Sequence, residues 1–67
     1  MTIRSFQNVT PDIHASVYVD PTALIIGKVS VAQDSSIWPG TVIRGDVNTI
    51  TIGQRTNVQD GTVIHVT

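Results

Sequence analysis

The stretch that decides the fold is residues 25–43, which read IIGKVSVAQDSSIWPGTVI. Every sixth position in this stretch holds Ile or Val, at Ile25, Val31, Ile37 and Ile43. A step of six matches neither the 3.6-residue period of an α-helix nor the two-residue alternation of a long strand. It is the spacing of a short strand followed by a turn, repeated along the chain.

The same spacing extends from this stretch in both directions. Toward the N-terminus it reaches Ile13 and Val19, and after a three-residue insertion it resumes at Ile52, Val58 and Ile64. Small or β-branched residues follow four positions later at Val17, Ala23, Val29, Ser35, Thr41, Val47, Thr56 and Thr62. Three such units close one triangular coil of about 18 residues, with the aliphatic residue inside and the small residue near a corner.

We therefore expect an all-β protein, a parallel β-helix of about three coils over residues 13–67 with an N-terminal cap over residues 1–12. Ile and Val together supply 19 residues against a single Leu, and such β-branched side chains favour strands. A β-sandwich or barrel is the alternative, but such folds have no reason to repeat at six. An α-helical reading is excluded by the missing 3.6-residue period and by Pro11, Pro21 and Pro39.

The composition narrows the classes of partner. A chain of 67 residues forms one small domain with a marginal core, so we expect it to need a partner chain or a metal. The four Lys and Arg residues are scattered and the net charge is -1, which disfavours nucleic acid. No apolar stretch approaches the roughly 20 residues that cross a bilayer, so we expect no membrane partner.

Cysteine is absent, which excludes disulfides and thiolate metal sites and favours a cytoplasmic location. Any metal ligand must therefore come from His, Asp or water.

The polar residues that offer chemistry gather between Ile43 and the end of the chain. Arg44 and His65 each follow an inward aliphatic residue, and they are 21 residues apart, which equals one coil plus the insertion. We therefore expect them to stack on one face in successive coils. Gln59 takes the equivalent position one face earlier, so we expect a group near one edge of the prism that consists of Arg44, Asp46, Gln59, Asp60 and His65.

Three segments of this region, residues 44–46 (RGD), 56–61 (TNVQDG) and 64–65 (IH), resemble in order and spacing the motifs of the γ-class carbonic anhydrases. The resemblance covers roughly residues 10–67, as the N-terminal portion of a longer domain. It implies a left-handed β-helix that assembles as a homotrimer, with three His residues binding zinc, or iron or cobalt, across the subunit interface.

The resemblance also implies a role for each matching residue. His65 matches the first metal ligand, and Gln59 matches the residue that hydrogen-bonds the metal-bound solvent. Arg44, Asp46 and Asp60 match the ion-pair residues that order the interface. Three imidazoles leave zinc one open position for water, and the bound hydroxide attacks carbon dioxide to give bicarbonate, a lyase reaction.

Two departures from the family pattern bear on this activity. The other two metal ligands lie beyond this chain, and His14 is expected on a different face three coils earlier, where it cannot replace them. Val47 stands where the family archetype has a proton-shuttle Glu, and the chain contains no Glu. Trp38 and Pro39 are expected at a strand–turn junction or an interface.

Two other functions remain open at the level of sequence. A hexapeptide acyltransferase shares the fold and uses a His as general base with a pantetheine cofactor. A non-catalytic β-helix scaffold or assembly subunit would need only the repeat. Metal content separates the first of these from a carbonic anhydrase.

Overall fold

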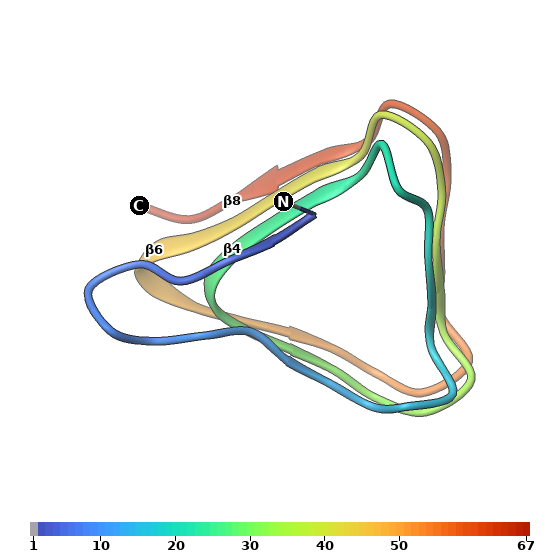
Figure 1. Ribbon diagram of the computed structural model, residues 1–67, viewed down its shortest axis with the longest axis horizontal. Coiled ribbons are helices and arrows are strands. Elements are labelled where there is room, and N and C mark those ends of the chain that lie inside the picture. Colours follow the sequence, from blue (N-terminus) through green and yellow to red (C-terminus); the bar gives the residue numbers. More distant parts are fainter. Residues whose placement is uncertain (1) are drawn as a thin grey trace.

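The computed structural model describes residues 2–67, which wind into a stack of triangular coils (Figure 1). Its strands are β1 (Ile3–Arg4), β2 (Asp12–Ile13), β3 (Tyr18–Val19), β4 (Leu24–Val31), β5 (Ser36–Ile37), β6 (Val42–Ile52), β7 (Asn57–Val58) and β8 (Val63–His65). Every pairing between these strands is parallel. Among the described residues no helix is long and apolar enough to cross a membrane.

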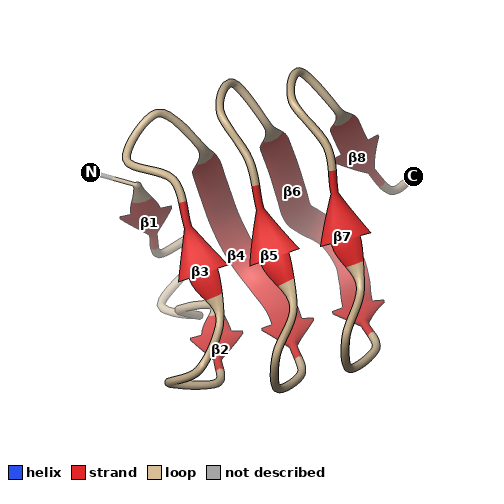
Figure 2. Ribbon diagram, turned by 90° about the vertical axis from the view of Figure 1, so that its right-hand side faces the viewer, coloured by secondary structure: helices blue, strands red, loops and turns tan. Residues whose placement is uncertain are grey.

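The coils wind in the left-handed sense. The chain runs counter-clockwise in Figure 1, and Figure 2 places its N-terminal coil on the side that faces the viewer of Figure 1. A chain that turns counter-clockwise while it recedes is left-handed. The expected fold class, a left-handed parallel β-helix of about three coils, is thus confirmed.

Three flat faces surround the core. The first face consists of β3, β5 and β7, with Tyr18 opposite Ser36 and Ser36 opposite Asn57. The long strands β4 and β6 bend at a corner, so each of them contributes to two faces. Their first halves form the second face with β1 and β8, and their second halves form the third face with β2.

The core consists of the residues that the six-residue step selects. Ile25, Ile37 and Ile43 are completely buried, and Val31, Ile52 and Val58 are at most 6 % exposed. The remaining members Ile13, Val19 and Ile64 belong to the first and last coils and are partly buried against this cluster. They have a neighbouring coil on one side only, which explains their greater exposure. The inward register is confirmed.

The insertion lies at the corner between the second and third faces. Gly27 pairs with Gly45, but two residues later Val29 pairs with Ile50, so three extra residues bulge out of β6. The expectation that Val47 fills the small corner position is wrong. Val47 is 72 % exposed, while Ile50 is 7 % exposed and occupies that position. The bulge shifts the small corner position by three residues, and a constant step of six does not predict this shift.

The N-terminal residues add to the stack. Strand β1 pairs with the start of β4, with Ile3 opposite Ile25, and a tight turn between Phe6 and Val9 returns the chain toward β2. A hollow of about 460 Å³ lies at this end of the prism, lined by Thr2, Ile3, Pro11, Ile13, Val19 and Pro21. The expected cap thus includes a strand of the second face, and its boundary at residue 12 stays a prediction.

Candidate functional site

Arg44 and His65 lie side by side on the second face. They are register partners on β6 and β8, directly after the partners Ile43 and Ile64. Because Ile43 points inward, the side chains that follow it point outward, and both Arg44 and His65 are exposed. Neighbouring strands lie about 4.8 Å apart, so the expected stacking of this guanidinium above this imidazole in successive coils is confirmed at the level of the backbone.

Asp46 joins this pair from the start of the bulge. Its Oδ2 lies 3.4 Å from Arg44 Nη1, and its Oδ1 accepts a hydrogen bond of 2.8 Å from the Val47 main-chain N–H. The Arg44 side chain is 46 % exposed and that of Asp46 is 20 % exposed. An exposed pair of this kind contributes only about 0–1 kcal/mol to the stability of a single chain. Its main effect is to hold the guanidinium near the corner.

Gln59 and Asp60 lie at a different corner. They form the turn between β7 and β8, where the Gln59 carbonyl accepts hydrogen bonds from Thr41 Oγ1 at 3.1 Å and Thr62 Oγ1 at 2.7 Å. In Figure 1 this corner is at the upper right, whereas β8 runs from it toward the left. The rest of this turn, in which Gly61 has a φ of 72°, and the whole of β8 separate Asp60 from His65.

The five candidate residues therefore form two groups within one chain rather than one cluster at an edge. The reason is the length of a face. Gln59 holds the position equivalent to His65 on the preceding face, and this position is a whole strand away from His65. Arg44, Asp46 and His65 lie on the second face and the bulge at its end, whereas Gln59 and Asp60 lie at the corner between the first and second faces.

A metal with three protein ligands does not fit this chain alone. Over residues 2–67, no three His, Asp or Glu side chains come close enough to hold one ion. His65 offers one imidazole on an open surface, and the other ligands would have to come from outside these residues. The roles of His65, Gln59, Arg44, Asp46 and Asp60 stay predictions.

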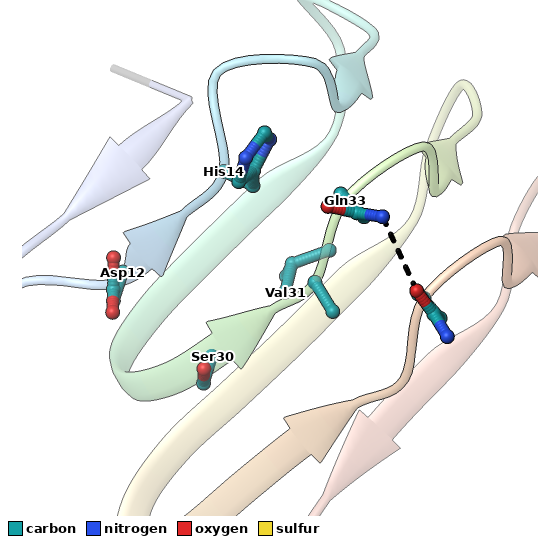
Figure 3. A pocket seen from close by; sticks show the side chains of 7 residues that line it. Asp12, His14, Ser30, Val31 and Gln33 are labelled. Carbon is teal, nitrogen blue, oxygen red and sulfur yellow. Dashed lines mark hydrogen bonds between the residues drawn. The ribbon is translucent and has the colours of Figure 1, made fainter.

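A second hollow, of about 390 Å³, lies on the third face (Figure 3). Its wall includes Asp12 and His14 from the first coil and Gln33, whose amide donates to Gln54 Oε1 at 3.3 Å. The His14 Nδ1 accepts the Ser16 main-chain N–H at 3.1 Å, so this ring nitrogen is occupied. His14 thus lies on a different face from His65 and does not supplement it.

The first face carries a polar and aromatic network that the repeat does not reveal. The rings of Tyr18 and Trp38 lie 5.1 Å apart between centroids, and Trp38 Nε1 donates to Asn57 Oδ1 at 2.6 Å. The signal available in the sequence was the alternation along these strands, in which every residue beside an inward Ile or Val points outward.

Asp20 stabilises one end of this network. It accepts hydrogen bonds from the Thr22 side chain at 2.6 Å and main chain at 2.9 Å, and these bonds hold the pKa of Asp20 below its ordinary value. The Tyr18 hydroxyl donates to the same carboxylate at 2.9 Å, which raises the pKa of Tyr18.

No protein-family profile matches the chain. It is 46 % identical over 65 residues to protein YrdA of Escherichia coli and 47 % identical over 66 residues to the mitochondrial gamma carbonic anhydrase 2 of Arabidopsis thaliana. These alignments cover 97 % and 94 % of this chain, but 35 % and 24 % of the relatives. The chain thus spans about a quarter to a third of the length of the curated relatives it matches.

A solved structure agrees with the fold. The crystal structure of a hexapeptide transferase family protein from Anaplasma phagocytophilum superposes with a TM-score of 0.91 at 40 % identity, over 92 % of this chain and 37 % of that one. Sequence and fold together therefore identify this chain as a homologue of proteins named gamma carbonic anhydrases, built on the hexapeptide-repeat β-helix.

Proposed function

We propose that this chain belongs to a γ-carbonic anhydrase-like metalloprotein, in which His65 supplies one ligand to a zinc, iron or cobalt ion. The observation that carries the proposal is the register pairing of Arg44 with His65, in a chain homologous to proteins named gamma carbonic anhydrases. A zinc ion held by imidazoles lowers the pKa of its bound water to about 7 and so provides hydroxide for the hydration of carbon dioxide.

The residues of this chain would prepare such a site. His65 lies on an exposed strand end beside Arg44, and the Arg44 guanidinium is held near the corner by Asp46. The Gln59 side chain follows an inward Val58 at the end of β7 and is exposed, where its amide can donate to or accept from a bound solvent molecule. Gln59 and His65 lie too far apart in one chain to act together, so we infer that they meet across an interface.

A homotrimer satisfies this requirement. One end of the second face carries Arg44 and His65, and the corner at its other end carries Asp60. Contacts between these unlike ends are head-to-tail, and such contacts close into a ring when the rotation between copies allows it. Asp60 of one copy would then approach Arg44 of the next, and Gln59 would approach His65.

The test is metal content in the protein as expressed from its gene. His65→Ala should remove the bound metal, whereas His14→Ala is the matched control because His14 lies on another face and should leave the metal content unchanged. Elemental analysis measures both. Unchanged metal in the His65 variant, together with normal hydration of carbon dioxide, would rule out the assigned ligand.

A hexapeptide acyltransferase is the alternative that a specific observation favours, since the solved neighbour is named a hexapeptide transferase family protein. Such an enzyme would use His65 as a general base and a pantetheine thioester as donor. Release of free thiol from acetyl-coenzyme A without any bound metal would favour this function over hydration of carbon dioxide. A scaffold would show neither activity.

A further inference from the structure

The first face carries six outward residues in two columns and three coils. Its strands β3, β5 and β7 are at the front of Figure 2. The register pairs Tyr18 with Ser36 and Ser36 with Asn57. Two residues after these, directly past the ends of the three strands, lie Asp20, Trp38 and Gln59. Because alternate residues of a strand point to the same side, both columns project from the outer surface.

Trp38 crosses from its own coil to the next. Its Nε1 lies 2.6 Å from Asn57 Oδ1 and 3.0 Å from Ser36 Oγ, and Ser36 Oγ lies 3.2 Å from the same Asn57 oxygen. An indole N–H can only donate, so the carboxamide atom that faces it must be the oxygen. This contact directs the Asn57 oxygen toward Trp38 and turns the Asn57 amino group away.

Tyr18 supports the indole from the first coil. The two rings are tilted by 44° at a centroid distance of 5.1 Å, an arrangement that aromatic pairs favour. The Tyr18 hydroxyl is itself held by Asp20 at 2.9 Å. Trp38 remains 36 % exposed. The indole is thus fixed on one side and open on the other.

We propose that Trp38 is a positioning residue for β7, because its N–H fixes the Asn57 carboxamide two residues before Gln59. The main-chain carbonyl of Gln59 accepts hydrogen bonds from Thr41 and Thr62. The position of the Gln59 side chain therefore depends on the position of its main chain at the end of β7. Trp38 thereby connects Gln59, the residue that we assign to solvent orientation, with the two preceding coils. The consequence for catalysis rests on the proposed function, whereas the positioning of Asn57 does not.

The test begins with the mobility of the Asn57 side-chain amide in ¹⁵N-labelled protein expressed from its gene. In the unmodified protein, the heteronuclear NOE of this amide should equal that of the β7 main chain. Trp38→Phe keeps an aromatic ring against Tyr18 but removes the shorter of the two contacts to Asn57 Oδ1, so the NOE should fall below that of the β7 main chain. Tyr18→Phe is the matched control, because it keeps the ring and leaves the Asn57 contact intact.

A second measurement follows the indole Raman band that reports hydrogen bonding of the N–H. The band of Trp38 is the part of the spectrum that the Trp38→Phe variant lacks. Because Ser36 Oγ is a second acceptor of this N–H at 3.0 Å, the Ser36→Ala/Asn57→Leu double variant should shift this band. The Ser36→Ala/Asn57→Asp double variant should retain it because a carboxylate still accepts. A mobile Asn57 amide in the unmodified protein, or a Raman band that the Ser36→Ala/Asn57→Leu variant leaves in place, would overturn the proposal.

Activity gives the readout that a merely structural role would not move. If the protein hydrates carbon dioxide, Trp38→Phe should lower kcat/KM by about 10-fold to 100-fold, as loss of supporting contacts does at metal sites, with metal content unchanged. An unchanged kcat/KM would contradict the catalytic consequence. A protein that never hydrates carbon dioxide would refute the proposed function, while the amide and Raman measurements would still decide the role of Trp38.

Discussion

Gly45 lies directly against the main-chain carbonyl of Lys28 in the coil before it. A Cβ added to Gly45 would meet the Lys28 carbonyl oxygen, lie 2.7 Å from the carbonyl carbon, and lie 3.0 Å from Val29 Cγ2. The backbones come this close because β6 leaves the regular register here to form the bulge. The middle residue of the segment Arg44–Gly45–Asp46 therefore has a structural reason to lack a side chain.

Gly45→Ala should destabilise the protein, because the contact is with backbone atoms that cannot move aside. Overpacking of this kind costs about 1–3 kcal/mol, and about 4–8 °C of Tm accompanies each kcal/mol in a domain of this size. Gly53→Ala is the matched control, since the nearest atom to its added Cβ is 3.9 Å away. Thermal unfolding of the two variants measures the difference, and equal Tm values would contradict the close approach.

Ile37→Asp should prevent folding. Ile37 is completely buried at the centre of the stack, where an unpaired carboxylate costs several kcal/mol against a marginal total stability. Val47→Asp introduces the same group on the exposed bulge and should change stability by no more than about 0.5 kcal/mol. Circular dichroism and urea unfolding compare them. A folded Ile37 variant would show that the inward register is misassigned.

Stability should fall in acid partly through Asp20. Its folded pKa is lowered by the Thr22 hydrogen bonds, so the stabilisation is present above the unfolded pKa of about 3.9. It is lost as pH falls through the lower folded pKa. Asp20→Asn should therefore reduce the loss of stability as the pH falls through and below the unfolded pKa, measured as the urea midpoint.

Asp12→Asn is the comparison for this experiment. It removes a carboxylate from the third face and keeps the Asp20–Thr22 contacts, so the acid-dependent loss should persist. The assignment to Asp20 fails if both variants change the urea midpoint by the same amount at each pH.

The proposed trimer leads to a charge-exchange experiment on the protein as expressed from its gene. Arg44→Asp or Asp60→Arg alone should weaken association, because each places like charges at the contact between copies. The double variant restores the attraction and should recover the trimer. Light scattering measures the molar mass. A double variant that remains dissociated, or single variants that remain trimeric, would argue against an Arg44–Asp60 contact.

The repeat in the sequence was sufficient to predict the coils and their inward residues. Ile25, Val31, Ile37 and Ile43 are buried as expected, because a constant step of six leaves the chain only one way to hide its β-branched residues. The stacking of Arg44 on His65 followed from the same arithmetic, since one coil plus the insertion equals their separation in the chain.

Tertiary structure decided what the repeat could not. The bulge exposes Val47 and buries Ile50, because three extra residues leave the sheet after Gly45 and shift the register of β6. The length of β8 separates Gln59 from His65, although both lie beside inward residues. The hydrogen bond from Trp38 to Asn57 joins residues of different columns and different coils. Such a contact depends on side-chain rotamers, which no period in the sequence encodes.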